Sequence, residues 1–493
     1  MNDRAKLELS VLAAAFTLGI LGDALLRCFP WGANFALWGS VLAAAIVLLG
    51  RSRRQAFAEG GYGLLLPIAF SPLAFLWHES PALAGLNVLA LLTALSLVLW
   101  RARGGRLRVS SLLQYAFGSL LAGLNAAFGM FSLLLGNREW RKTLGEGQFR
   151  KAVAVLRGCA LSVPPLLVFG GLFIGADAVF RNLVVRFLRA APNHLALFAF
   201  IAYCAGGYLR GLLWGEELNL GTPKRLLPIS LGGIETGVML GLLDLLFLAF
   251  VAVQVRYFFG GSALVQATTG LTYAEYARRG FFELVTVAAL LLPFLLLVHW
   301  LLRPEDVKVQ RLFRWLAGMQ IALLFVIMAS AFQRLRLYQA EYGLSEQRLY
   351  PTAFMGWLGV VFVWFALTVL RGHRERFAFG AMVAGFLLVA ALHALHPDAL
   401  IARTNLARAQ AGSTFDARYA SRLSADAVPD LVAGLPVLNP QDRCTLAAHL
   451  LERWSPPENP DWRSWTYARS RAWEVIRENE PALRVAACPE SGK

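Results

Sequence analysis

Long apolar segments are the feature that most constrains how this chain of 493 residues can fold. A helix needs about 20 mostly apolar residues to cross the hydrocarbon core of a bilayer. Backbone polar groups must be satisfied internally there, so such segments predict helices. We therefore predict an all-α, polytopic transmembrane helix bundle with eleven spans. These are 8–27, 32–50, 61–77, 82–100, 159–180, 194–214, 234–257, 277–302, 315–334, 352–370 and 378–395.

Composition excludes the other broad classes of protein. Hydrophobic residues make up 57% of the chain and charged residues only 16%, against about 25% charged in a typical soluble protein. The formal net charge is +16, which in a soluble protein would suggest nucleic acid. Short cytoplasmic loops of membrane proteins collect Lys and Arg, so we expect the lipid bilayer as partner and no nucleic acid.

The loop charges predict the orientation. With the N-terminus in the cytoplasm, the inside segments hold 25 basic residues and the outside segments before residue 397 hold 10. This agrees with the positive-inside rule. The main inside clusters are 51–54, 101–108, 138–157, 303–314 and 371–376. Eleven spans then leave the C-terminus outside, and the charged, apolar first segment is expected to be a retained helix.

One apolar segment breaks this pattern. Residues 109–136 are long enough to span, but basic clusters flank them on both sides. We predict an interfacial or re-entrant helix here, since an amphipathic helix lies in the membrane plane. If this segment crosses instead, the bundle has twelve spans and the C-terminus moves to the cytoplasm.

The composition changes near residue 396. From 397 to 493 the chain is polar and has helical spacing, with Pro-rich turns at 436–440 and 456–460. We predict two domains: a helix bundle over 1–396 and a small, extracytoplasmic helical tail over 397–493.

The segment 234–257 carries small residues and one acid. Gly233, Gly237 and Gly241 follow at four-residue spacing, which allows another helix to pack closely. Asp244 shares their face, and an ionised carboxylate at this depth costs at least ~2.5–3.5 kcal/mol unless it is paired or hydrated. Two interpretations stay open: a proton or cation site, or a protonated Asp244 that is hydrogen-bonded to a neighbouring helix.

Alternating charges open the next apolar segment, in the stretch TYAEYARRGFFEL. Acidic and basic side chains recur there at four-residue spacing, so they meet on one helix surface. This cluster at the outer membrane boundary either binds a polar ligand, docks the tail or clamps a neighbouring loop. The residues are Glu275, Tyr276, Arg278, Arg279 and Glu283, of which the last enters the hydrocarbon.

The cysteines and motifs assign little chemistry. Cys444 and Cys488 share the tail, and an oxidising compartment permits a disulfide between them. Ligand spacing for a metal ion is missing, and so is any nucleotide-binding or hydrolase motif. We therefore assign no catalytic residue, no metal and no cofactor.

The chain contains five specific stretches along its length: GDALLRCFPWGAN (22–34), LFIGADAVF (172–180), TYAEYARRGFFEL (272–284), PDALIARTNLARA (397–409) and SADAVPDLV (424–432). In these stretches the chain resembles a bacterial family of polytopic membrane proteins known as domain of unknown function 4173, which is related to domain of unknown function 4153. The resemblance implies a protein of the bacterial cytoplasmic membrane and no known reaction, substrate or catalytic residue.

Three classes of function remain. The first is a non-enzymatic inner-membrane component whose periplasmic tail, 397–493, binds an envelope protein. The second is a proton- or ion-coupled transporter or channel that uses Asp244, with Glu283 as a gate or second site. The third is a membrane-embedded enzyme acting on lipid or glycan, which would need a positioned acid or base. We rank the enzyme last because the outer loops are short.

Overall fold

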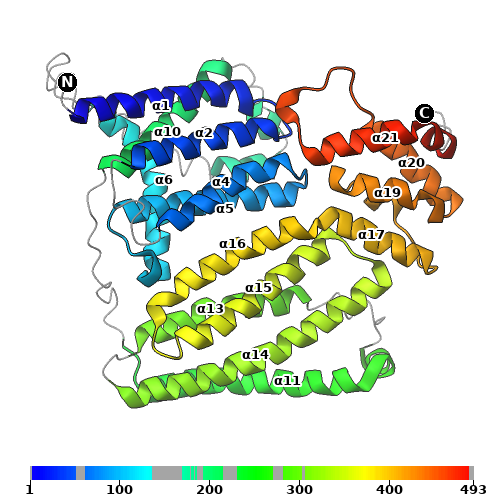
Figure 1. Cartoon of the computed structure of the whole chain (residues 1–493). Helices are drawn as coiled ribbons and strands as arrows, with labels where there is room; N and C mark the ends of the chain where they lie inside the picture. Colours follow the sequence, from blue (N-terminus) through cyan, green and yellow to red (C-terminus); the bar gives the residue numbers. More distant parts are fainter. Residues whose placement is uncertain are drawn as a thin grey trace. The chain divides into compact units, whose positions relative to one another are not determined.

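The computed structural model describes residues 3–51, 61–135, 169–177, 179–182, 184–185, 193–214, 230–269, 281–302 and 306–487. Every named element in these ranges is a helix, and the β-bridge between Leu231 and Leu302 is isolated. The predicted all-α fold is therefore confirmed (Figure 1).

Nine helices in the described residues are long and apolar enough to cross a membrane. They correspond to nine of the eleven predicted spans, and the chain is a multi-pass membrane protein. The predicted span 61–77 forms a shorter apolar stretch, Gly61–Leu76. Its middle helix contains Pro72, which cannot donate a backbone hydrogen bond, and a 3₁₀ helix follows. The predicted span 159–180 begins outside the described residues.

Contacts divide the chain into two compact units. Unit 1 comprises Met1–Asn219 and Asn459–Tyr467, and unit 2 comprises Leu220–Glu458 and Ala468–Lys493. This division falls inside the apolar region and groups most of the tail with the second half of the bundle. The predicted boundary between 1–396 and 397–493 stays a prediction.

In unit 1, α10 packs along both α1 and α6, and α5 packs against α6. Each helix buries one stripe of apolar side chains, as Val11, Ala15 and Leu18 of α1 illustrate, which is the spacing of a helix with one packed face. The described helices of this unit are α1 (Asp3–Leu26), α2 (Ala33–Gly50), η1 (Gly61–Leu64), α4 (Leu65–Leu73), η2 (Ala74–Leu76), α5 (Pro81–Ala102), η3 (Leu107–Val109), α6 (Leu112–Leu135), α10 (Asn193–Trp214) and η7 (Trp462–Ser464).

The helices α6 and α10 touch through their backbones. A Cβ atom at Gly129 would lie 2.3 Å from the carbonyl oxygen of Gly207, so no larger residue fits there without a shift. Beside this contact, the Tyr203 hydroxyl donates to the Ala127 carbonyl at 2.5 Å. Since α10 is a candidate span, α6 packs against a helix that is able to cross a membrane. The interfacial or re-entrant placement of 109–136 stays a prediction.

The segment Asn459–Tyr467, here called the strap, belongs to unit 1 although its sequence neighbours belong to unit 2. The Arg463 guanidinium pairs with Asp461 at 2.7 Å and donates to the carbonyl of Ala24, near the end of α1, at 2.9 Å. The first backbone N–H of α2 donates to the carbonyl of Trp465 at 2.9 Å. The strap therefore holds the turn between α1 and α2.

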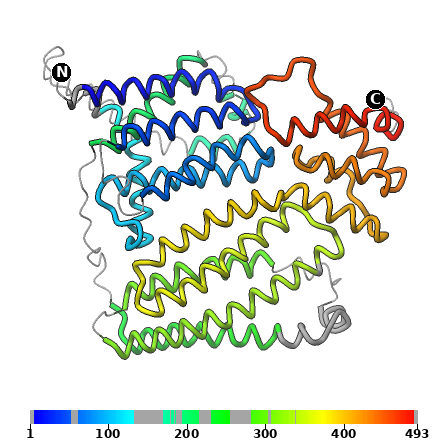
Figure 2. Tube along the Cα trace, in the orientation of Figure 1, coloured from blue at the N-terminus to red at the C-terminus, as the bar shows by residue number. Residues whose placement is uncertain are grey.

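The membrane helices of unit 2 surround an apolar core whose fully buried side chains include Phe313, Phe362 and Phe365. A short turn joins α14 to α15, and α11 runs along α14 (Figure 2). The helices are α11 (Gly233–Thr269), α13 (Phe281–Leu301), α14 (Val307–Tyr342), α15 (Glu346–Thr368), η4 (Arg374–Arg376) and α16 (Phe377–Leu395).

The helices after residue 396 gather around a second apolar core, which includes Leu406, Leu431, Leu446 and Ile476 together with Leu344 from the α14–α15 turn. The tail is therefore packed onto that turn. Its elements are α17 (Pro397–Gln410), α18 (Ala417–Ala420), η5 (Ala425–Ala427), α19 (Val428–Gly434), η6 (Leu435–Val437), α20 (Pro440–Trp454) and α21 (Tyr467–Ala486).

Candidate functional site

Asp244 lies on the packed face of α11. Leu240, Asp244, Phe247, Val251 and Gln254 are all buried and follow one another at spacings of four and three residues. This is the repeat by which two helices pack along a common seam. The sequence therefore places a carboxyl group inside a helix–helix seam, midway along a candidate span.

The facing helix is α14, and it runs parallel to α11. Gln254 accepts a hydrogen bond at 3.0 Å from Ser330, which lies 76 residues later in the sequence. At the other end of the seam, a Cβ atom at Gly233 would lie 3.5 Å from Val309, which is again 76 residues later. Because this separation is the same at both ends, Asp244 on α11 and Gln320 on α14 lie at the same height along the seam.

Both of these facing residues are buried without partners. Asp244 is 8% exposed and Gln320 is fully buried. Neither carboxylate oxygen of Asp244 and neither amide atom of Gln320 has a hydrogen-bond partner among the described residues. Buried polar groups are almost always hydrogen-bonded, and each one left unsatisfied costs ~1–3 kcal/mol. This level of the seam can therefore hold a proton, a water or a cation that satisfies both side chains.

A second polar level lies ten residues further along the seam, roughly 15 Å away at the rise of an α-helix. There the Gln254 side-chain oxygen accepts from the Ser330 hydroxyl and from the Arg334 guanidinium. Arg334 lies near the end of the apolar part of α14. The polar side chains of Gln254 and Ser330 are therefore hydrogen-bonded near the end of the seam. Those of Asp244 and Gln320, further inside, have no hydrogen-bond partner among the described residues.

The structure places the other predicted residues of this region apart from Asp244. Glu283 is exposed in the first turn of α13. Gly233 and Gly237 lie on the seam within ordinary contact of Val309 and Leu312, whereas a Cβ at Gly241 would contact nothing within 4 Å among the described residues. The packing role of the three glycines stays a prediction.

Several predicted residues lie outside the described part of the chain. Glu275, Tyr276, Arg278 and Arg279 are among them, as is Cys488. Cys444 lies in the second turn of α20, and its pairing with Cys488 stays a prediction. In unit 1, Asp23 is paired with Arg27 at 3.4 Å and with His194 at 2.8 Å.

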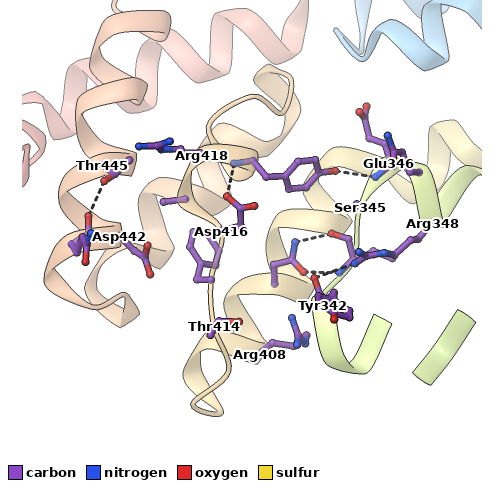
Figure 3. A pocket seen from close by; sticks show the side chains of 17 residues that line it. Tyr342, Ser345, Glu346, Arg348, Arg408, Thr414, Asp416, Arg418, Asp442 and Thr445 are labelled. Carbon is purple, nitrogen blue, oxygen red and sulfur yellow. Dashed lines mark hydrogen bonds between the residues drawn. The ribbon is translucent and has the colours of Figure 1, made fainter. Parts of the chain in front are cut away.

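Sequence reasoning missed a polar cavity of about 790 Å³, formed within unit 2 by the α14–α15 turn and the tail helices α17, α18 and α20 (Figure 3). Three arginines and three acids line it, together with hydroxyl and amide groups. The lining residues are Tyr342, Leu344, Ser345, Glu346, Gln347, Arg348, Asn405, Arg408, Thr414, Phe415, Asp416, Ala417, Arg418, Tyr419, Gln441, Asp442 and Thr445.

Hydrogen bonds to the backbone make the wall of this cavity rigid. Asn405 accepts from the backbone N–H of Leu344 at 2.7 Å and donates to its carbonyl at 2.8 Å. The Tyr419 hydroxyl accepts from the first backbone N–H of α15 at 2.9 Å. Burial raises the pKa of Tyr419 to about 12, so its hydroxyl keeps its proton at neutral pH. The Arg418 side chain is exposed and has no hydrogen-bond partner among the described residues.

The cavity gave no sequence signal because its residues come from four segments spread over about 100 positions. Its charges balance, with Arg348, Arg408 and Arg418 against Glu346, Asp416 and Asp442 in the lining. Such a mixed lining suits a polar partner that carries both signs of charge.

Comparison with known proteins gives one finding. A family described as Domain of unknown function (DUF4153) matches residues 65–434, which is most of the chain. No curated protein and no solved structure matches significantly. The sequence resemblance named the 4173 family; the match supports the related 4153 family, and membership of the former stays a prediction.

Proposed function

The chain belongs to the family described as Domain of unknown function (DUF4153), and on this premise we propose that it is an ion-coupled transporter in which Asp244 binds and releases a proton or a cation. The family description assigns no reaction, so the proposal comes from the site. We further propose that the protein lies in a bacterial inner membrane, with its N-terminus in the cytoplasm and its tail in the periplasm.

One observation carries this proposal: two facing buried side chains, Asp244 and Gln320, have no hydrogen-bond partner among the described residues. Ionisable residues inside a membrane are expensive, and they mark ion pathways or proton relays. An ion or a proton at Asp244 would balance its charge, and the amide oxygen of Gln320 would supply a further ligand or acceptor. The second polar level, at Gln254 and Ser330, would form the next station toward the end of the seam.

The competing interpretation is structural. A protonated Asp244 donates to Gln320, and the pair fixes the register of α11 against α14. A single buried polar residue has this role in many coiled coils. Both interpretations predict that Asp244 tolerates no apolar substitute, so only a variant that keeps the hydrogen bond and loses the ionisation separates them.

Asp244→Asn is that variant. The purified protein is reconstituted in liposomes on a solid-supported membrane, and a rapid pH jump is applied. Wild-type protein is expected to give a transient charge displacement as Asp244 exchanges its proton, without the need to know the transported substrate. Asp244→Asn, at equal abundance, should abolish the displacement.

The matched control is Glu341→Gln, which makes the same change in an exposed acid near the end of α14. It should leave the displacement close to that of wild type. An unchanged signal in Asp244→Asn would refute the transport proposal and leave Asp244 with the structural role.

A second candidate function is a non-enzymatic membrane component whose tail binds an envelope protein, and the polar cavity favours it. A photoreactive residue at Gln441, on the rim of the cavity, should then cross-link a defined partner in intact cells. The same residue at His449, which is exposed on α20 outside the cavity lining, should not. Equal cross-linking from both positions would argue against a site at the cavity.

A further inference from the structure

One end of the unit 2 bundle gathers basic side chains from the first turns of α14 and from the segment between α15 and α16. These two parts of the chain lie at the same end, because a Cβ at Gly372 would lie 3.9 Å from the Arg314 guanidinium. The guanidinium groups of Arg314 and Arg374 also interact electrostatically with His299, at the end of α13. Residues from three helices and a turn thus meet at one place.

The positive charge at this end exceeds the negative charge. Lys308, Arg311, Arg314, Arg371, Arg374 and Arg376 face three acids in the described residues, Glu235, Asp306 and Glu375. Two of the acids are already engaged with backbone: Asp306 accepts from two N–H groups at the start of α14, and Glu235 accepts from Gly232. The guanidinium group of Arg314 and that of Arg374 make no hydrogen bond or ion pair with any described residue.

Beneath these arginines lies a buried polar atom. The ring of His299 packs edge-on against Phe313, with the ring centroids 5.2 Å apart. Its Nδ1 is buried and has no hydrogen-bond partner among the described residues. Arg374 itself is half-buried, so its guanidinium has lost part of its hydration, and what it gains in return is the electrostatic attraction of the exposed Glu375. The cluster therefore brings together several hydrogen-bonding groups that have no side-chain partner among the described residues.

The neighbouring surface of α14 is apolar. Trp315 is 76% exposed and Met319 is 56% exposed, one helical turn apart. Tryptophan is enriched at the level of lipid headgroups, where one side is polar and the other apolar. An apolar path along α14 thus begins next to the basic cluster, and an acyl chain attached to a bound headgroup could follow it.

We propose that this end of unit 2 binds the headgroup of an anionic phospholipid, with Arg314 and Arg374 donating to its phosphate and Trp315 and Met319 contacting its acyl chain. Arginine binds phosphate oxygens in a two-pronged geometry that suits such a site. Basic pockets between transmembrane helices bind anionic headgroups in this way. A positive surface that merely satisfies the positive-inside rule would instead attract lipid evenly through all of its charges.

The test compares two double variants by native mass spectrometry of the full chain in detergent, titrated with phosphatidylglycerol or phosphatidylcholine. Arg314→Gln with Arg374→Gln should weaken phosphatidylglycerol binding at least about 30-fold, because each substitution removes a charge-assisted hydrogen bond to the phosphate. Phosphatidylcholine binding should not change. The matched control, Arg371→Gln with Arg376→Gln, removes the same charge from exposed positions of the same turn and should change binding by no more than about threefold.

Equal losses in the two double variants would overturn the site and leave a diffuse surface field. Retention of phosphatidylglycerol by the first variant would overturn it as well. If that variant does not fold, Arg314→Lys with Arg374→Lys keeps the charge and loses the two-pronged contact, and it should still weaken binding severalfold. Unchanged binding in the lysine variant would also contradict the proposal.

Discussion

The contact between α6 and α10 gives a sharp test of the fold. Gly129→Ala would place a methyl group 2.3 Å from the carbonyl oxygen of Gly207 and 2.8 Å from its Cα. Ordinary contacts begin near 3.4 Å, so the two backbones must separate by about 1 Å, in a core that is packed as densely as an organic crystal. Separation also weakens the hydrogen bond from the Tyr203 hydroxyl to α6.

Overpacking of this kind costs ~1–3 kcal/mol. A loss of about 2 kcal/mol lowers the melting temperature of a domain of this size by roughly 4–8 °C. The control is Gly123→Ala on the same helix, where the new methyl group would meet no described residue within 4 Å. Alanine has the better helix propensity, so this control should melt at or above the temperature of the wild type.

The assay is thermal unfolding of the purified full chain in mild detergent, with both variants measured beside the wild type. Equal melting temperatures for Gly129→Ala and Gly123→Ala would refute the backbone contact. They would also remove the main evidence that α6 belongs to the bundle.

Three further predictions concern the tail and the strap. Asn405→Ala removes two hydrogen bonds to the α14–α15 turn and should destabilise the tail by ~1–3 kcal/mol, seen as faster limited proteolysis in membranes; unchanged proteolysis would contradict it. Hydrogen bonds from Arg463 hold the pKa of Asp461 in the folded protein below its ordinary value. The Asp461 carboxylate therefore stabilises the fold fully above about pH 4, and this stabilisation is lost as the pH falls through the lower pKa of the folded state. The melting-temperature gap between wild type and Asp461→Asn should therefore persist from pH 7 to about pH 4 and shrink only below it; a gap that closes near neutral pH would be inconsistent with this. An impermeant thiol reagent on intact cells should label Cys444 and Cys488 only after reduction, whereas labelling only after lysis would place the tail in the cytoplasm.

Hydropathy predicted most of the helices because span length and apolar composition are local properties of the chain. Nine predicted spans match helices that can cross a membrane. The predicted span 61–77 is the exception, and its cause is also local. Pro67 and Pro72 interrupt the segment, and both lack the backbone N–H that a continuous helix needs. The mean hydropathy of the segment does not detect these missing N–H groups. The helix over 112–135 could also be predicted from its apolar composition, but its close packing against α10 could not.

Partner choice was the part that sequence could not give. Four-residue spacing predicted a packing role for Gly233, Gly237 and Gly241, whereas no such spacing pointed to the close backbone contact of α6 with α10 at Gly129 and Gly207. Spacing shows which residues share a face and does not show what covers that face. Asp244 could be identified as buried in the membrane by its position in an apolar run. Its neighbour Gln320 required the register of α11 against α14, which depends on contacts between residues far apart in sequence.

The polar cavity and the basic end of unit 2 illustrate the same limit. Their residues are ordinary loop and helix-end side chains, common in any membrane protein. Only the fold brings Arg314 near Gly372, or Asn405 onto the α14–α15 turn. Sites assembled from several helix ends carry no spacing that a single sequence could reveal.

The strap also sets an order of events during synthesis. Cys28, in the turn after α1, donates a hydrogen bond to Asp461, which lies 433 residues later. At 5–20 residues per second a ribosome needs roughly 20–90 s to make the intervening chain. The first hairpin is therefore in the membrane long before its strap exists, and its turn stays uncovered for that time. A nascent chain stalled before residue 459 would leave this turn exposed to proteases, so unit 1 is complete only after translation has passed residue 467.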